Sequence, residues 1–336
     1  MRLPYILTSS GDGEDPYRSY RPPTRPPGWP EDDLRLRPAG GRSGQPAAPW
    51  ATRRDIISAI VIGFSAFVYV AFIGGLADVV WEGEEGMLIA SYIVVAVLLV
   101  AVALTVAAFA RLNVAMLAGI LVITTAIVVV MRVLADAQGP HDELFGLPVQ
   151  FIDGALSSSM FMATAWLFWR LKYHAPARSV GFVAPARPTA YLWALGAWLL
   201  ALVAIAIWGT IVERFGILEP PDNAEQALEI AGGGIGPALL LVGLLAPFAE
   251  EVFFRGFLLT ALLGRMKPLA ALLLSSLIFA LFHLAPGLYI PTFVLGLALG
   301  WVYLKTHSIW PSIFLHAVHN SLVITATWQG LNAPDA

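Results

Sequence analysis

The sequence predicts an all-α fold, a polytopic transmembrane helical bundle of about nine spans with a range of eight to ten. Hydrophobic residues make up 58% of the 336 residues, charged residues only 13%, and the mean hydropathy is +0.73. Charge is concentrated at one end, because residues 1–54 hold 15 of the 43 charged residues. A long remainder with so few charges is typical of a chain whose solvent is lipid.

Three regions follow one another along the chain. Residues 1–54 are rich in Pro and Arg and show no apolar period, which predicts a disordered cytoplasmic tail. Residues 55–234 are expected to hold the N-terminal transmembrane helices with their loops. Residues 235–330 are expected to form a C-terminal transmembrane core, which carries the residues of chemical interest.

Nine apolar runs come close to the ~20 residues that an α-helix needs to cross the hydrocarbon core. The eighth is short and is expected to be tilted or partly re-entrant. A short amphipathic stretch is expected around residues 224–230, in the loop after the fifth run. The predicted spans are residues 56–80, 87–110, 114–133, 151–169, 191–212, 235–263, 268–284, 290–304 and 309–328.

The loop charges predict an orientation. Across nine spans, Lys and Arg gather in loops on one side, whereas the opposite loops are mainly acidic. Because Lys and Arg are retained in the cytoplasm, we expect a cytoplasmic N-terminus and an external C-terminus in the plasma membrane of a bacterium. Arg132, near the outer end of the third span, is the exception, and its long side chain is expected to snorkel toward the interface.

The composition also excludes several kinds of chemistry. The chain has no Cys, so disulfides, thiolate metal sites and Cys nucleophiles are excluded. No basic surface large enough for nucleic acid remains outside the tail. The lipid bilayer is therefore the expected partner, and the sequence carries no signal for an oligomeric state.

The first of three polar clusters in the late spans is Glu250-Glu251-Val-Phe-Phe-Arg255. An ionisable residue at the centre of a span costs about 2.5 to 3.5 kcal/mol on insertion scales, so it implies a partner or a function. Glu251 and Arg255 are spaced i,i+4 and are expected to pair. Glu250 lies about 100° around the helix and stays outside that pair. A carboxylate in an apolar pocket suits a general base or acid, although a buried ion pair with a spare Glu is the structural alternative.

The second cluster is His283, which follows Ser275, Ser276 and Phe279 on the next span. Taken alone, such a His is more often a hydrogen-bonded interface residue than a catalyst. Glu250 and His283 are 15 and 18 residues from Arg265 in the connecting turn. At a rise of 1.5 Å per residue, antiparallel helices place the two side chains at nearly equal depth, where they can face each other.

The third cluster lies on the last span. His316 and Asn320 are spaced i,i+4 and project from one face, while His319 projects from a neighbouring face. For Ser312, ordinary hydrogen bonding between helices is the expected role.

Together the three clusters resemble a known family. The motifs Glu-Glu-x-x-x-Arg, Phe-x-x-x-His and His-x-x-x-Asn, in this order on separate late spans, are similar to those of the CPBP family of intramembrane endopeptidases. This family includes CAAX prenyl endopeptidases, bacteriocin-processing enzymes and Abi proteins. The similarity covers about residues 235–328, and every motif position is intact. It implies that 235–330 is a CPBP-like catalytic core.

The resemblance also implies roles for the six motif residues. Glu250 and His283 would activate the attacking water, and His316 and Asn320 would stabilise the oxyanion of the tetrahedral intermediate. Glu251 with Arg255 would orient Glu250 from behind. The expected function is that of an intramembrane endopeptidase that hydrolyses a peptide bond of a membrane-associated peptide or protein.

A metal is left open. Glu250, His283 and His316 could supply two imidazoles and a carboxylate to a divalent ion such as zinc. A metal-free mechanism is slightly preferred, because the Asn320 amide suits an oxyanion better than a zinc ion. The signatures of other intramembrane proteases, such as His-Glu-x-x-His, are missing from the sequence.

Two functions of other classes remain as alternatives. A transporter or a proton or ion relay would use Glu250, Arg255 and His283 as a path through the membrane. A catalytically inactive immunity or scaffold protein would use none of them. A relay would survive the loss of His316 and Asn320, whereas a protease depends on all of the motif residues together.

Overall fold

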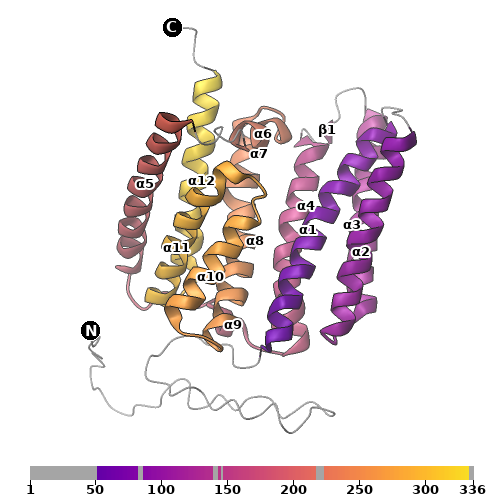
Figure 1. Ribbon diagram of the computed structural model, residues 1–336. Helices are drawn as coiled ribbons and strands as arrows, with labels where there is room; N and C mark the ends of the chain where they lie inside the picture. The colour runs from indigo at the N-terminus through magenta and orange to yellow at the C-terminus, as the bar shows by residue number, and fades with distance from the viewer. Residues whose placement is uncertain (1–50, 82–85, 139–142, 145–146, 217–222, 333–336) are drawn as a thin grey trace. The chain divides into compact units, whose positions relative to one another are not determined.

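The computed structural model describes residues 51–81, 86–138, 143–144, 147–216 and 223–332 (Figure 1). Almost all of the predicted disordered tail therefore lies outside the described residues. The described part is a helical membrane bundle, as the composition predicts, and its strands are a two-residue antiparallel pair. These strands are β1 (Glu143–Leu144) and β2 (Leu147–Pro148), which pair Glu143 with Pro148.

Long apolar helices make up the first half of the bundle. Each follows an apolar run of the sequence, because a helix satisfies every backbone polar group internally where no water is present. They are α1 (Arg53–Trp81), α2 (Gly86–Phe109), α3 (Val114–Gln138), α4 (Val149–Trp166) with its π-helical continuation η2 (Leu167–Lys172), and α5 (Ala190–Phe215), which a short 3₁₀ turn η3 (Ala177–Val180) precedes. The next helix is the amphipathic α6 (Asn223–Ile230), where the sequence predicts one.

The second half contains one long composite helix and three further helices. The composite helix runs from residue 235 to residue 263 and alternates between α and π geometry. Its segments are α7 (Ile235–Ala238), η4 (Leu239–Leu245), α8 (Ala246–Glu251), η5 (Val252–Leu259) and α9 (Thr260–Leu263). It is followed by α10 (Pro268–Leu281), a 3₁₀ turn η6 (Pro286–Leu288), α11 (Tyr289–Thr306) and α12 (Trp310–Leu331).

Seven stretches of the described helices are long and apolar enough to cross a membrane. They match seven of the predicted spans. Of the other two, α10 has only 14 residues, and α12 has 22 residues but lies outside the apolar set. The count of nine is therefore not confirmed, and both helices that fall outside the seven carry or adjoin polar motif residues.

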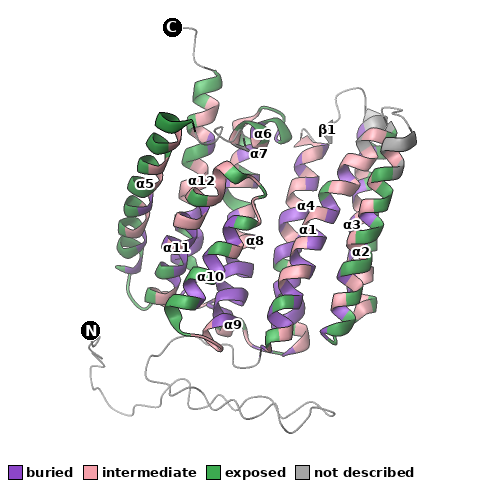
Figure 2. Cartoon of the chain, viewed as in Figure 1, coloured by how far each residue is buried: buried purple, intermediate pink, exposed green. Residues whose placement is uncertain are grey.

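The composite helix is the centre of the packing. Its α8 and η5 segments contact α4, α10, α11 and α12, while α1 packs against α2, α3 and α4. Figure 2 shows α8 and η5 largely buried, whereas α2 and α5 are largely exposed. Every residue of η5 is buried, Arg255 included. The η5 segment of the composite helix is thus surrounded by protein, whereas Leu240, Leu244 and Leu245 in η4 are exposed.

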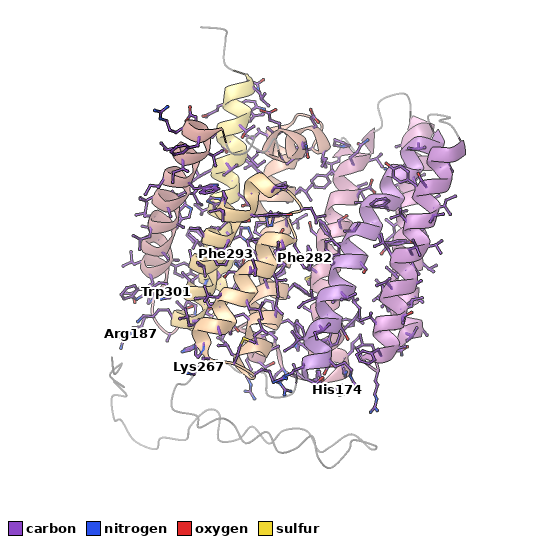
Figure 3. All side chains as sticks on the ribbon, in the orientation of Figure 1. His174, Arg187, Lys267, Phe282, Phe293 and Trp301 are labelled. Carbon is purple, nitrogen blue, oxygen red and sulfur yellow. The ribbon has the colours of Figure 1, made fainter. Side chains whose placement is uncertain are left out.

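One end of the bundle gathers the basic residues. Figure 3 shows His174, Arg187 and Lys267 at the same end of the helices. At this end Arg265 donates to the Ala51 carbonyl over 3.0 Å, and Lys172 contacts the Ala110 carbonyl. The ends of α1, α2, η2 and α9 therefore meet there. That this end faces the cytoplasm stays a prediction.

The expectation for Arg132 is wrong. Its side chain does not reach the interface but is 6% exposed, and it donates to Asp153 over 2.7 Å and to the Gly74 carbonyl over 3.0 Å. The reason is Asp153 on the neighbouring helix α4, an acidic residue inside a predicted span. A buried guanidinium next to a carboxylate is neutralised in place and has no need of solvent.

Candidate active site

The helix around Glu250 and Glu251 is irregular on both sides. The regular segment α8 has Pro247 in its first turn and ends at Glu251. A π-helical segment precedes it and another follows it. A π segment inserts an extra residue into a turn, so it turns the following side chains relative to a regular helix. Such insertions are frequent at functional sites. Here they set the directions in which the two carboxylates and Arg255 project.

Glu251 and Arg255 form the expected pair. Nη1 of Arg255 donates to Oε1 of Glu251 over 2.6 Å, and both side chains are buried. Nη2 of Arg255 donates to the Gly296 carbonyl on α11 over 3.2 Å. The pair on the composite helix is therefore bonded to a second helix, α11, which a surface ion pair would not be.

His316 joins this pair from α12. Its Nδ1 lies 2.9 Å from Oε1 of Glu251, and because a carboxylate only accepts, Nδ1 carries the proton that it donates. The other ring nitrogen, Nε2, lies 3.8 Å from Oε2 of Glu250. The imidazole thus stands between the two adjacent carboxylates. In this structure Glu251 contacts His316, whereas the resemblance led us to expect it behind Glu250.

His283 lies in the turn that follows α10. Its Nδ1 is 3.0 Å from the Phe279 carbonyl, an acceptor, so Nδ1 donates and Nε2 keeps its lone pair. His283 also interacts electrostatically with Glu250 and with His316. The histidine of the second motif is therefore electrostatically coupled to the first and third motifs, and that Glu250 and His283 face each other at equal depth stays a prediction.

Asn320 is one turn beyond His316 on α12. Its Nδ2 donates to the carbonyl of Val242 in η4 over 3.0 Å. One of the two amide hydrogens is thus engaged with the composite helix, two turns before Glu250. This contact fixes the amide group in direction, and it leaves one N–H for another acceptor.

Phe279 joins the three motifs in a way that sequence reasoning missed. Its ring meets the rings of His283 and His316 edge to face, with centroids 5.0 and 5.7 Å apart. The Arg255 guanidinium lies 4.4 Å from the same ring centroid. The signal was present, since Phe279 precedes His283 by one helical turn. The Phe279 ring is thus the apolar surface against which His283, His316 and Arg255 pack.

Two oxygens of this group are buried and lack a hydrogen-bond partner. They are Oε2 of Glu250 and Oε2 of Glu251. Buried carboxylate oxygens are normally satisfied, so each such exception asks for an explanation. The Glu250 side chain as a whole remains 19% exposed, in contrast to Glu251 at 0%. Of the two carboxylates, only the Glu250 side chain therefore has any surface that is not covered by protein.

The fit to a metal is incomplete. Both histidines have Nδ1 engaged with an acceptor and Nε2 free, as metal-ligating histidines usually do. Yet within the described residues no three His, Asp or Glu side chains are placed so that they could hold a metal ion. As they stand, Glu250, His283 and His316 do not form a ligand set, so no step below passes through a metal.

Comparison with known proteins agrees with the motifs. A family model described as type II CAAX prenyl endopeptidase Rce1-like matches residues 233–322, which include all six candidate site residues. A Bacillus subtilis (strain 168) protein named "Putative membrane peptidase YdiL" is 29% identical over 135 residues, or 40% of this chain and 54% of that protein. The chain thus spans about half the length of this curated relative. No solved structure matches the present chain.

These matches confirm the resemblance to the CPBP family over the C-terminal part of the chain. At the level of the family they support a membrane protease. Residues 1–232 lie outside the segment that the family model matches.

Proposed function

We propose that the chain is an intramembrane endopeptidase that hydrolyses a peptide bond of a membrane-associated peptide or protein. The observation that carries the proposal is the unpartnered Oε2 of Glu250, buried 3.8 Å from Nε2 of His316. Two hydrogen bonds of ~2.6 to 3.2 Å that meet at an angle span such a distance, so we place the attacking water as a bridge between these atoms. The proposal rests on this unsatisfied carboxylate oxygen beside an imidazole, in an otherwise apolar helix packing.

Glu250 acts as the general base. The water loses a proton to Oε2 of Glu250 while its oxygen attacks the carbonyl carbon of the substrate, and the carbonyl π electrons move onto oxygen. His283 accepts a hydrogen bond from the second O–H of the same water through the lone pair on Nε2, which orients the water while this hydrogen stays on its oxygen. Because Nδ1 of His283 is held by the Phe279 carbonyl, the ring keeps this tautomer.

The oxyanion is stabilised from α12. Asn320 offers the amide hydrogen that Val242 does not engage. His316 offers a proton at Nε2 when it is protonated, and Glu251 supports that imidazolium at Nδ1. With Arg255 as the second cation, the two carboxylates are then balanced charge for charge. Fixed donors of this kind work best where water is excluded.

The reaction closes without a further group. The proton held by Glu250 passes to the amide nitrogen of the intermediate, the C–N bond breaks, and the oxyanion collapses to a carboxylic acid. One water is consumed and Glu250 returns to its starting state. Every step needs Glu250, whereas Glu251 and Arg255 serve to place His316.

Peptidomics of membranes tests the proposal. Membranes that contain the wild type should accumulate cleaved products that are missing from membranes with Glu250→Ala. Glu229→Ala, at an exposed acid of α6 away from the motifs, is the matched control and should give the wild-type products. Identical peptide profiles of the wild type and Glu250→Ala would contradict the proposal. Charge movement across the membrane that persists without His316 and Asn320 would instead favour the relay.

A further inference from the structure

His283 lies in the turn that ends α10. Helix α10 ends at Leu281, and Phe282 is its C-terminal cap. The His283 ring is bonded through Nδ1 to the Phe279 carbonyl, so it follows the position of this helix end. Leu284, directly after His283, has a positive φ of 52°, which turns the chain away from the helix axis. The contacts of Phe282 therefore bear on where His283 lies.

The ring of Phe282 touches four other aromatic rings. The centroid distances are 5.1 Å to Phe64, 5.6 Å to Phe161, 6.3 Å to Phe253 and 5.4 Å to Phe254. The contacts to Phe64 and Phe254 are edge to face, the geometry that aromatic pairs prefer. Figure 3 shows Phe282 in the interior of the bundle, between the helices of the candidate site and α4.

Two of these four rings come from outside the matched segment. Phe64 belongs to α1 and Phe161 to α4, whereas Phe253 and Phe254 belong to η5. Residues 233–322 therefore do not complete the surroundings of Phe282 by themselves.

Gly63 allows α1 to come this close. A Cβ atom at this position would lie 3.1 and 3.2 Å from two ring carbons of Phe253. A larger residue at 63 would therefore push against the same group of rings. The fit of α1 to η5 rests on the absence of a side chain next to Phe64.

We propose that Gly63, Phe64 and Phe161 form a positioning surface that fixes the His283 turn through Phe282. The inference rests on the proposed function, because it assigns His283 a direction that only catalysis requires. Phe282 is a positioning residue, since it acts through His283. In lipid, helices associate through close packing rather than through a hydrophobic driving force, so the loss of a ring contact loosens the turn directly. This gives α1 and α4 a part in the reaction.

The kinetic test compares ring positions. Phe282→Leu and Phe64→Leu should lower kcat by roughly tenfold to a hundredfold with little change in KM, the cost of a displacement of up to about 1 Å at a reacting group. Phe282→Tyr keeps the ring and should retain most of the activity. Phe72→Leu is the control, because Phe72 lies on the same helix α1 but packs against Tyr92 of α2 at 5.5 Å, outside the rings that surround Phe282.

A spectroscopic test separates this inference from the proposed function. The chain has six histidines, so the ¹⁵N imidazole signals of His283 can be assigned by their loss in His283→Gln. In Phe282→Leu and Phe64→Leu these signals should shift or broaden, while in Phe72→Leu they stay as in the wild type. That result supports the positioning surface even if no cleavage is found in any variant. Unchanged His283 signals in both of the first two variants, or equal changes in Phe72→Leu, would overturn it.

Discussion

Two groups of buried charges lie in different halves of the chain, and they differ in how completely they are satisfied. Near the start of α1, Asp55 is fully buried and accepts from Thr52, Lys172 and Tyr173. In the candidate site, Glu250 and Glu251 each keep one buried oxygen without a partner. Both groups carry the cost of charge in an apolar surrounding, but only the second leaves capacity for a ligand.

The satisfied group around Asp55 joins the ends of several helices. Thr52 Oγ1 accepts from the Asp55 N–H over 3.2 Å, and Asp55 accepts from the Thr52 N–H over 3.0 Å, which is a capping box at the start of α1. Lys172 adds η2 and, through the Ala110 carbonyl, the end of α2. A buried charge whose hydrogen bonds are all made, such as Asp55, stabilises the fold. A buried carboxylate that keeps an oxygen without a partner, such as Glu250, is the one available for function.

The largest effect is expected where both properties meet, at Glu251. Glu251→Gln leaves Arg255 without its counter-charge and should lower the free energy of unfolding by roughly 3 to 5 kcal/mol. It also removes the negative charge that supports the His316 imidazolium, so cleavage should fall by about 10² or more, as for the loss of an oxyanion donor. Thermal unfolding in detergent and a cleavage assay measure the two losses. A variant as stable and as active as the wild type would show that Glu251 places nothing.

Asp55→Asn should affect stability alone. The substitution leaves Lys172 as a buried cation without its carboxylate, and the free energy of unfolding should fall by roughly 3 to 5 kcal/mol. Cleavage per folded molecule should stay near the wild-type value at a temperature where both proteins are folded. A hundredfold loss of cleavage in fully folded Asp55→Asn would break the distinction between the two groups.

The Arg132–Asp153 pair tests the same distinction through a single and a double variant. Replacing a buried ion pair by apolar residues of similar volume is often neutral, whereas removing one partner costs roughly 3 to 5 kcal/mol. We therefore expect Arg132→Met to lower the thermal midpoint and the double variant with Asp153→Leu to recover most of it. Activity per folded molecule should stay at the wild-type value in both the single and the double variant. A double variant that unfolds as readily as the single one would count against a purely structural pair.

Removal of metal should have the smallest effect. The protein is dialysed against a strong chelator, loss of metal is verified by elemental analysis, and cleavage is measured before and after zinc is added back. We expect unchanged cleavage in the stripped enzyme. Activity that is abolished by stripping and restored by stoichiometric zinc would turn Glu250, His283 and His316 into ligands.

Much of the fold could be predicted because lipid leaves few options. Apolar runs of about twenty residues must become helices, and all nine predicted runs are helical at nearly the expected bounds. Seven of these helices are long and apolar enough to span a membrane, and the count of nine is not confirmed at α10 and α12, where length or polarity departs from a simple span. The error at Arg132 arose because Asp153 was counted within an apolar run. In fact Arg132 on α3 and Asp153 on α4 are a charged pair between adjacent helices.

The site was predictable where its contacts are local. The Glu251–Arg255 pair follows from the i,i+4 spacing alone. The bond from His316 to Glu251 joins residues 65 positions apart and depends on how α12 packs against α8, which spacing does not encode. The π-helical segments around α8 also have no sequence signal of their own, because they arise from tertiary packing. Thr52-x-x-Asp55, by contrast, is a local capping signal that sequence reasoning overlooked.

The central claim is that the unpartnered carboxylate of Glu250 does the chemistry, and Glu250→Gln tests it most directly. The amide keeps the size and hydrogen-bonding capacity of the side chain but cannot accept the proton of the water. The rate of substrate cleavage is measured for purified wild type and variant at equal folded concentration, with the thermal midpoint determined in parallel. The account predicts a loss of at least ~10² in rate with a thermal midpoint close to that of the wild type. A Glu250→Gln protein that cleaves at the wild-type rate would contradict it.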